Sequence, residues 1–246
     1  MPSGNAASFT AGVLLAALTP YPVQAEVATD APPLDARVIE PHTASFEIAH
    51  IDADGTRVSG GRWTDEVTIS DGKLVRTVVR YSPQGEADLK RTIVADSVTL
   101  KPELLDQRFG PGLAGVMHVD FDGHRVHQLL IRQPNQSAVT IDAQFDRDVW
   151  ELSLWGTLAM SLPFETGSEY MIPTIAPDRR SVRDVTFRIE GVEEIDLGGR
   201  ILTAAKVVVP EEHWVFWVRK QAPYIVRIEH PAPGGLTAVS TLAPAN

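Results

Sequence analysis

The sequence predicts a mainly β protein in which a strongly curved antiparallel sheet, a half-open β-barrel or β-spiral, surrounds one buried α-helix. Short segments of alternating apolar and polar residues recur along the chain with turn signals between them, which indicates roughly a dozen strands. The 18 glycines and 18 prolines are consistent with frequent turns. One segment, at about 146–162, instead has helical length and is apolar nearly all round, so it must be buried on most sides.

Composition limits the classes of protein that fit. A length of 246 residues with 43% hydrophobic residues suits one β-barrel-like domain, which we place at 42–243. The 22 Lys and Arg against 32 Asp and Glu give a net charge of −10, which argues against a nucleic-acid partner. The absence of cysteine excludes disulfides, thiolate nucleophiles and zinc ribbons.

The first 25 residues read as a secretory signal peptide. They carry no charged side chain, contain the apolar run 9–18, and end in Val23-Gln24-Ala25, which suits signal peptidase. The run is shorter than the roughly 18 residues that a membrane span needs, so we expect no membrane-spanning helix. The mature chain then begins near Glu26, with a Pro-rich lead-in over 26–41.

The strand candidates follow in order. Segments 45–49, 66–69 and 74–81 are separated by Asp54-Gly55 and Asp71-Gly72. Alternation puts Arg76 and Arg80 on one face of 74–81, and it puts Arg91 on the apolar face of 87–95. Further candidates are 114–121, 124–132, 136–143, 168–175, 182–190, 200–209, 213–219, 224–230 and 236–242, with Asp122-Gly123 and Gly198-Gly199 as the clearest hairpin turns.

The helix candidate has its own start and stop signals. Asp146 is placed as an N-cap and Pro163 as a stop. The main apolar arc, at helical spacing, consists of Leu152, Trp155, Leu158, Ala159 and Leu162.

The densest polar cluster is the segment 117–127. If Asp122-Gly123 form the loop, His118 lies opposite His127 and Asp120 opposite Arg125 on one side of the hairpin. Two imidazoles beside a carboxylate could hold zinc with one position open. No known metal motif has this spacing, so we predict a solvated face without metal or cofactor, with His118, Asp120 and His127 only as weak candidate ligands.

Catalytic signatures are absent from the sequence. It contains no G-x-S-x-G, S-x-x-K or H-E-x-x-H motif and no glycine-rich phosphate loop. Glu165, Glu169, Glu193 and Glu194 could supply a carboxylate pair, but nothing in the sequence brings two of them together. We therefore predict a protein that is not an enzyme.

Aromatic residues gather in two segments. In 213–219, alternation sends Trp214 and Phe216 to one face and Trp217 to the other, so both faces should be covered. With Trp150 and Trp155 on the helix, two interpretations stay open. One is a packed core. The other is an apolar pocket between helix and sheet for an acyl chain or another amphiphile, with these five aromatic residues as candidate ligand contacts.

The second half of the chain carries a recognisable series of motifs. These are Ser161-Leu162-Pro163-Phe164-Glu165-Thr166-Gly167, then 189–200 with Ala205-Lys206-Val207, then Phe216-Trp217-Val218, 223–229 and Gly234-Gly235-Leu236, with Leu100-Lys101-Pro102 upstream. Over about 40–242 the chain resembles an uncharacterised proteobacterial periplasmic domain family of curved β-sheet proteins. Its broader relatives include lipoprotein carriers and envelope-integrity β-spiral proteins. The resemblance implies a half-open barrel in the periplasm and a role in the cell envelope, and it brings no catalytic residues.

The leading hypothesis is therefore a non-enzymatic periplasmic protein that binds an amphiphile or envelope component on the concave face of its sheet. The alternative is an envelope interaction or scaffold protein that holds protein partners without a small ligand. A metal-binding protein or hydrolase is the third possibility.

Overall fold

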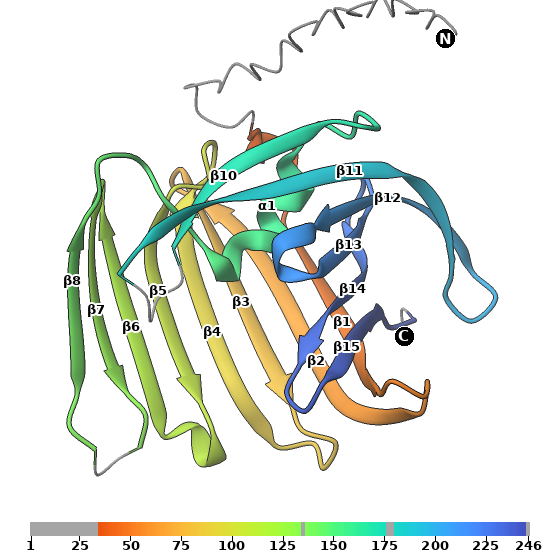
Figure 1. The fold of residues 1–246 in the computed structure, drawn as a ribbon, viewed down its shortest axis with the longest axis horizontal. Coiled ribbons are helices and arrows are strands. Elements are labelled where there is room, and N and C mark those ends of the chain that lie inside the picture. Colours follow the sequence, from red (N-terminus) through yellow and green to blue (C-terminus); the bar gives the residue numbers. More distant parts are fainter. Residues whose placement is uncertain (1–33, 134–135, 176–179, 245–246) are drawn as a thin grey trace, which may run out of the picture. The chain divides into compact units, whose positions relative to one another are not determined.

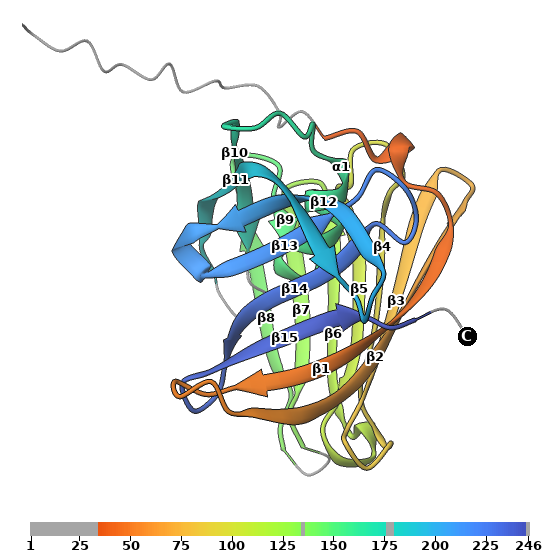
Figure 2. The same cartoon turned by 90° about the vertical axis from the view of Figure 1, so that its right-hand side faces the viewer.

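The computed structural model describes residues 34–133, 136–175 and 180–244. The expected signal peptide and the first half of the lead-in, 26–33, lie outside these residues. These described residues form one compact unit. Its strands make a single sheet of 15 strands, in the order β8-β7-β6-β5-β4-β3-β2-β1-β15-β14-β13-β12-β11-β10-β9. Figures 1 and 2 show this sheet curving around the short helix α1 without closing, which confirms the predicted fold class.

The strands follow the chain as two antiparallel meanders joined at β1 and β15. The first meander runs through β1 (His42–Ile51), β2 (Arg57–Ser70), β3 (Lys73–Tyr81), β4 (Ala87–Asp96), β5 (Pro102–Phe109), β6 (Gly115–Asp122), β7 (Arg125–Ile131) and β8 (Val139–Gln144). The second contains β10 (Glu169–Ile175), β11 (Val182–Asp196), β12 (Ile201–Val209), β13 (Trp214–Val218), β14 (Ile225–Ala232) and β15 (Leu236–Leu242). The short β9 (Trp150–Glu151) pairs in parallel with β10.

The two edges of the sheet, β8 and β9, are joined by residues 145–149 alone. Six residue steps from Gln144 to Trp150 reach at most about 20 Å. The chain therefore crosses from one edge to the other over a short distance. It then enters η3 (Leu152–Leu154) and α1 (Trp155–Ser161), which lead into β10.

The helix is shorter than the sequence predicts. Instead of one helix over 146–162, Trp150 and Glu151 pair with Thr174 and Ile175 as a parallel strand. The Glu151 carboxylate then accepts a hydrogen bond from the Ser153 backbone N–H and caps η3. All seven residues of α1 are buried, so the expected burial of this segment is confirmed although its extent is wrong.

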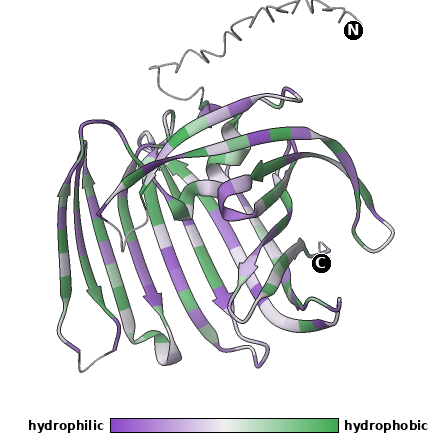
Figure 3. Ribbon diagram, viewed as in Figure 1, coloured by the Kyte–Doolittle hydropathy of each residue, from purple (hydrophilic) through white to green (hydrophobic). Residues whose placement is uncertain are grey.

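The core lies between α1 and the face of the sheet that curves around it. Figure 3 shows hydrophobic and hydrophilic residues interleaved along the long strands, as expected when only one face is buried. The Phe46 and Trp63 rings stack there at 4.0 Å between centroids. The end of the expected lead-in also joins the core, because Ala36 in η1 (Ala36–Val38) and Ile39 are buried.

The hairpin between β6 and β7 has a different register from the predicted one. Asp122 pairs with Arg125, so Gly123 and His124 form the loop. Gly123 has a φ of 58° and occupies the first central position, where a type II′ turn needs glycine. As a result His127 pairs with Asp120, and His118 pairs with Leu129 instead of His127.

Candidate functional site

A cavity of about 640 Å³ lies between α1 and the concave face of the sheet. This volume is within the range of small-molecule binding sites. Its walls come from both meanders and from α1, so residues far apart in the sequence meet there. The lining residues used below are His50, Trp63, Arg76, Arg80, Asp88, Arg91, Trp155, Gly156, Trp214, Phe216 and His230.

One wall of the cavity is aromatic. Trp155 meets Trp214 edge-to-face at 5.7 Å between ring centroids. Trp214 in turn stacks on Phe216 at 5.6 Å and on His230 at 4.4 Å. Burial lowers the pKa of His230, partly offset by its hydrogen bond to the Pro231 carbonyl. The imidazole therefore favours its neutral form, and the wall is apolar in character.

Arg76 connects the sheet to α1. Its Nε and Nη2 donate to the two carboxylate oxygens of Asp65, both at 2.9 Å, and both side chains are buried. Its Nη1 donates to the Ser153 carbonyl at 3.4 Å and to Thr157 Oγ1 at 3.2 Å. Gly156 permits this contact, because a Cβ there would lie 3.3 Å from Arg76 Nη1 and 2.9 Å from Ile225 Cδ1.

Two further arginines reach the cavity. Arg80 Nε donates to Asp88 at 2.8 Å in a partly exposed ion pair. Arg91 is half-buried, and its Nε donates to Gln107 Oε1 at 2.7 Å. Burial lowers the pKa of Arg91, while the nearby Glu151 acts in the opposite direction.

Some buried polar side-chain atoms have no hydrogen-bond partner in the described part of the chain. They are Trp155 Nε1, Glu151 Oε1 and both amide atoms of Gln128. Burial also raises the pKa of Glu151, against the opposing effect of Arg91. Unpaired buried polar groups are costly, and of these residues Trp155 lines the cavity.

The structure places the five aromatic candidates in different environments. Trp155, Trp214 and Phe216 line the cavity. Trp150 does not, because its indole N–H donates to the Thr99 carbonyl at 3.3 Å within the core. Trp217 points to the opposite face of β13 from Phe216, where its indole donates to Glu193 at 2.7 Å.

The sequence interpretation missed the polar half of the cavity, namely Arg76, Arg80, Arg91 and His50, and it also missed His230 in the aromatic wall. A signal was present, because Arg91 shares a face with apolar residues of its strand. A charged residue on an apolar face indicates a buried ion pair or a binding site.

The candidate metal ligands remain on the other face of the sheet. His118 Nε2 lies 3.2 Å from a carboxylate oxygen of Asp120, and His118 Nδ1 lies 3.7 Å from one of Asp106. His127 Nδ1 instead lies 2.6 Å from a carboxylate oxygen of Asp142. The hydrogen bond from His127 lowers the pKa of Asp142. Among the described residues, no group of three or more His, Cys, Asp or Glu is placed to hold a metal ion.

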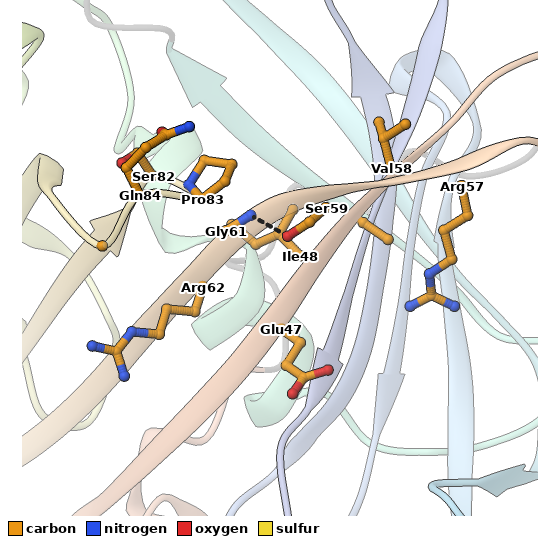
Figure 4. A pocket seen from close by; sticks show the side chains of 12 residues that line it. Glu47, Ile48, Arg57, Val58, Ser59, Gly61, Arg62, Ser82, Pro83 and Gln84 are labelled. Atoms are coloured by element: carbon orange, nitrogen blue, oxygen red, sulfur yellow. Dashed lines mark hydrogen bonds between the residues drawn. The ribbon is translucent and has the colours of Figure 1, made fainter.

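A second cavity of about 600 Å³ lies beside the β-bulge between β1 and β2. Figure 4 shows that the side chains of Arg57 and Arg62 point to different sides of it, and that Gly61 N–H donates to Ser59 Oγ, at 3.4 Å. Its charged groups do not converge, so the cavity beside α1 is the better candidate site.

Comparison with known proteins agrees with this architecture. Residues 45–241 match the model of the family described as "Protein of unknown function (DUF3108)". The chain belongs to this DUF3108 family. A solved structure, a beta-barrel-like protein of domain of unknown function DUF1849 from Brucella abortus, matches with a TM-score of 0.51 and 9% identity. The match covers 87% of this chain and 98% of that one, and it shows a shared fold.

No curated protein sequence matches this DUF3108 chain. In the described residues, no helix combines the length and the apolar character needed to cross a membrane.

Proposed function

We propose that this protein is a non-enzymatic periplasmic component of the cell envelope that binds an amphiphile in the cavity beside α1. The observation that carries the proposal is the cavity itself, which combines a wall of Trp155, Trp214 and Phe216 with arginines on β3 and β4. An amphiphile has the same division, because its chain needs apolar surface and its headgroup needs polar partners. The cavity is large enough for about 20 water molecules, which a ligand would displace.

Binding is tested with two tryptophans of one strand. Trp214→Ala is expected to weaken binding of a fluorescent fatty acid about tenfold, because it removes part of the aromatic wall. Trp217→Ala makes the same truncation on the opposite face of β13 and should leave affinity nearly unchanged. Fluorescence titration of both variants measures the difference, and equal losses would contradict binding at this cavity.

Mass spectrometry of a lipid extract from the purified protein tests occupancy directly. We expect an amphiphile to be retained by the natural chain and depleted in Trp214→Ala. If no amphiphile is extracted and no fatty acid binds, the alternative is favoured, in which the protein holds envelope proteins together without a small ligand.

Export is a separate prediction from the uncharged apolar N-terminal segment. N-terminal sequencing of protein recovered from the periplasm should begin near Glu26, after cleavage behind Ala25. Recovery of the intact chain from the cytosol alone would rule out the periplasmic assignment.

A further inference from the structure

We propose that the ligand of this cavity is an acidic amphiphile and that Arg91 binds its carboxylate or phosphate group. The inference rests on the proposed binding function and specifies its ligand class. It depends on one structural difference among the three arginines of the cavity, namely what each guanidinium already binds.

Two of the three guanidiniums are neutralised by carboxylates of the chain. Arg76 makes a bidentate pair with the buried Asp65, and its remaining terminal nitrogen donates to α1 and η3. Arg80 is paired with Asp88, which is the one acid among the described lining residues. These two arginines therefore have structural partners and bring little free positive charge to the cavity.

Arg91 differs from both. Its Nε donates to Gln107 Oε1, which orients the guanidinium, while Nη1 and Nη2 make no hydrogen bond or ion pair with the described residues. No carboxylate in the described part of the chain lies within ion-pair distance of Arg91. A planar guanidinium with two free terminal nitrogens matches the paired oxygens of a carboxylate or phosphate.

Glu151 is the acid that acts on Arg91, but among the described residues the two side chains form no ion pair. The Glu151 carboxylate instead accepts a hydrogen bond from the Ser153 backbone N–H, and burial raises its pKa against the opposing effect of Arg91. In a chain with a net charge of −10, an inward-facing unpaired arginine is a local positive centre. Arg91 and the aromatic residues line the same cavity, so one ligand can place its headgroup against Arg91 and its chain against the aromatic rings.

The test compares ligands that share a twelve-carbon chain, namely dodecanoic acid, dodecyl phosphate and dodecanol, by isothermal titration calorimetry. We expect at least one of the two acids to bind about tenfold or more tightly than dodecanol, because charge-assisted hydrogen bonds are stronger than neutral ones. The acid that binds more tightly identifies the headgroup as carboxylate or phosphate.

Arg91→Gln should reduce binding of the acids to the level of dodecanol while leaving dodecanol affinity unchanged. Arg91→Lys, which keeps the charge but not the planar fork, should retain part of the preference. Lys90→Gln is the matched control, since it removes the same charge from the adjacent, exposed position of β4 and should bind as the natural chain does.

The outcomes separate the two proposals. If dodecanol binds the natural chain as tightly as the acids, or if Arg91→Gln keeps the acid preference, the headgroup assignment is wrong and amphiphile binding stands. If none of the three ligands binds the natural chain, both proposals fail. If Arg91→Gln does not fold, the selectivity of the natural chain tests the ligand class, and the partial loss of acid preference in Arg91→Lys tests the contact with Arg91.

Discussion

Replacing Arg76 by methionine is expected to lower the free energy of unfolding by about 3–5 kcal/mol, as for other buried ion pairs that lose one partner. The substitution leaves Asp65, which is 2% exposed, without its counter-charge. It also removes the hydrogen bonds from the guanidinium to Ser153 and Thr157, which connect β3 to η3 and α1. Urea unfolding followed by tryptophan fluorescence measures the loss.

Two controls define the cause of that loss. Arg80→Met breaks a pair whose side chains are 47% and 36% exposed, so its cost should stay within about 1 kcal/mol. Adding Asp65→Leu to Arg76→Met removes the unpaired charge and should recover most of the lost stability. If the double variant is no more stable than Arg76→Met, the cost comes from the lost attachment of α1 and not from Asp65.

The sequence predicts which residues share a face better than it predicts register. Asp71-Gly72 forms the expected two-residue turn, with φ values of 50° and 74° that suit a type I′ turn. Asp122-Gly123 has the same two residue types, yet the loop there is formed by Gly123 and His124, one residue later than predicted. The displacement keeps His118 and His127 on one face, so the alternation pattern is satisfied by both registers and cannot distinguish them.

The start of the helix depends on the pairing of β9 with β10, which the sequence of the helix segment alone does not reveal. An apolar run such as 149–154 is compatible with a buried helix and with a buried strand, and periodicity alone does not decide. Because Trp150 pairs with Thr174, the beginning of the run 149–154 is a strand. Strand β5 was missed for a related reason, because adjacent Leu104 and Leu105 break the alternation.

The polar half of the cavity forms because the curvature of the sheet brings residues of different strands together. Alternation places Arg76 and Arg91 each on a face of its strand, but it does not say that both faces point inward. The Asp65–Arg76 pair also needs the register of β2 on β3, where Asp65 lies beside Val78 and Val67 beside Arg76. A diagonal pair of this kind follows from the assembled sheet and not from the spacing along the chain.

The largest packing effect is expected at Trp155. This residue is 1% exposed and meets both Phe187 and Trp214 edge-to-face, at 5.9 and 5.7 Å between centroids. Trp155→Ala therefore removes the central aromatic contact between α1 and the sheet. We expect it to cost about 3–5 kcal/mol, through lost burial and an enlarged cavity. That is a large part of the 5–15 kcal/mol by which a domain is usually stable.

The same variant tests where α1 lies. Because Trp155 also lines the cavity, fatty-acid affinity should fall together with stability in Trp155→Ala. The control is Ser153→Thr, which keeps the hydroxyl and the backbone carbonyl that binds Arg76. It should change stability far less. Urea unfolding beside fluorescent fatty-acid titration separates the two effects. A Trp155→Ala protein with unchanged stability would contradict the burial of α1 within the curve of the sheet, whereas a destabilised protein with unchanged affinity would place the ligand elsewhere.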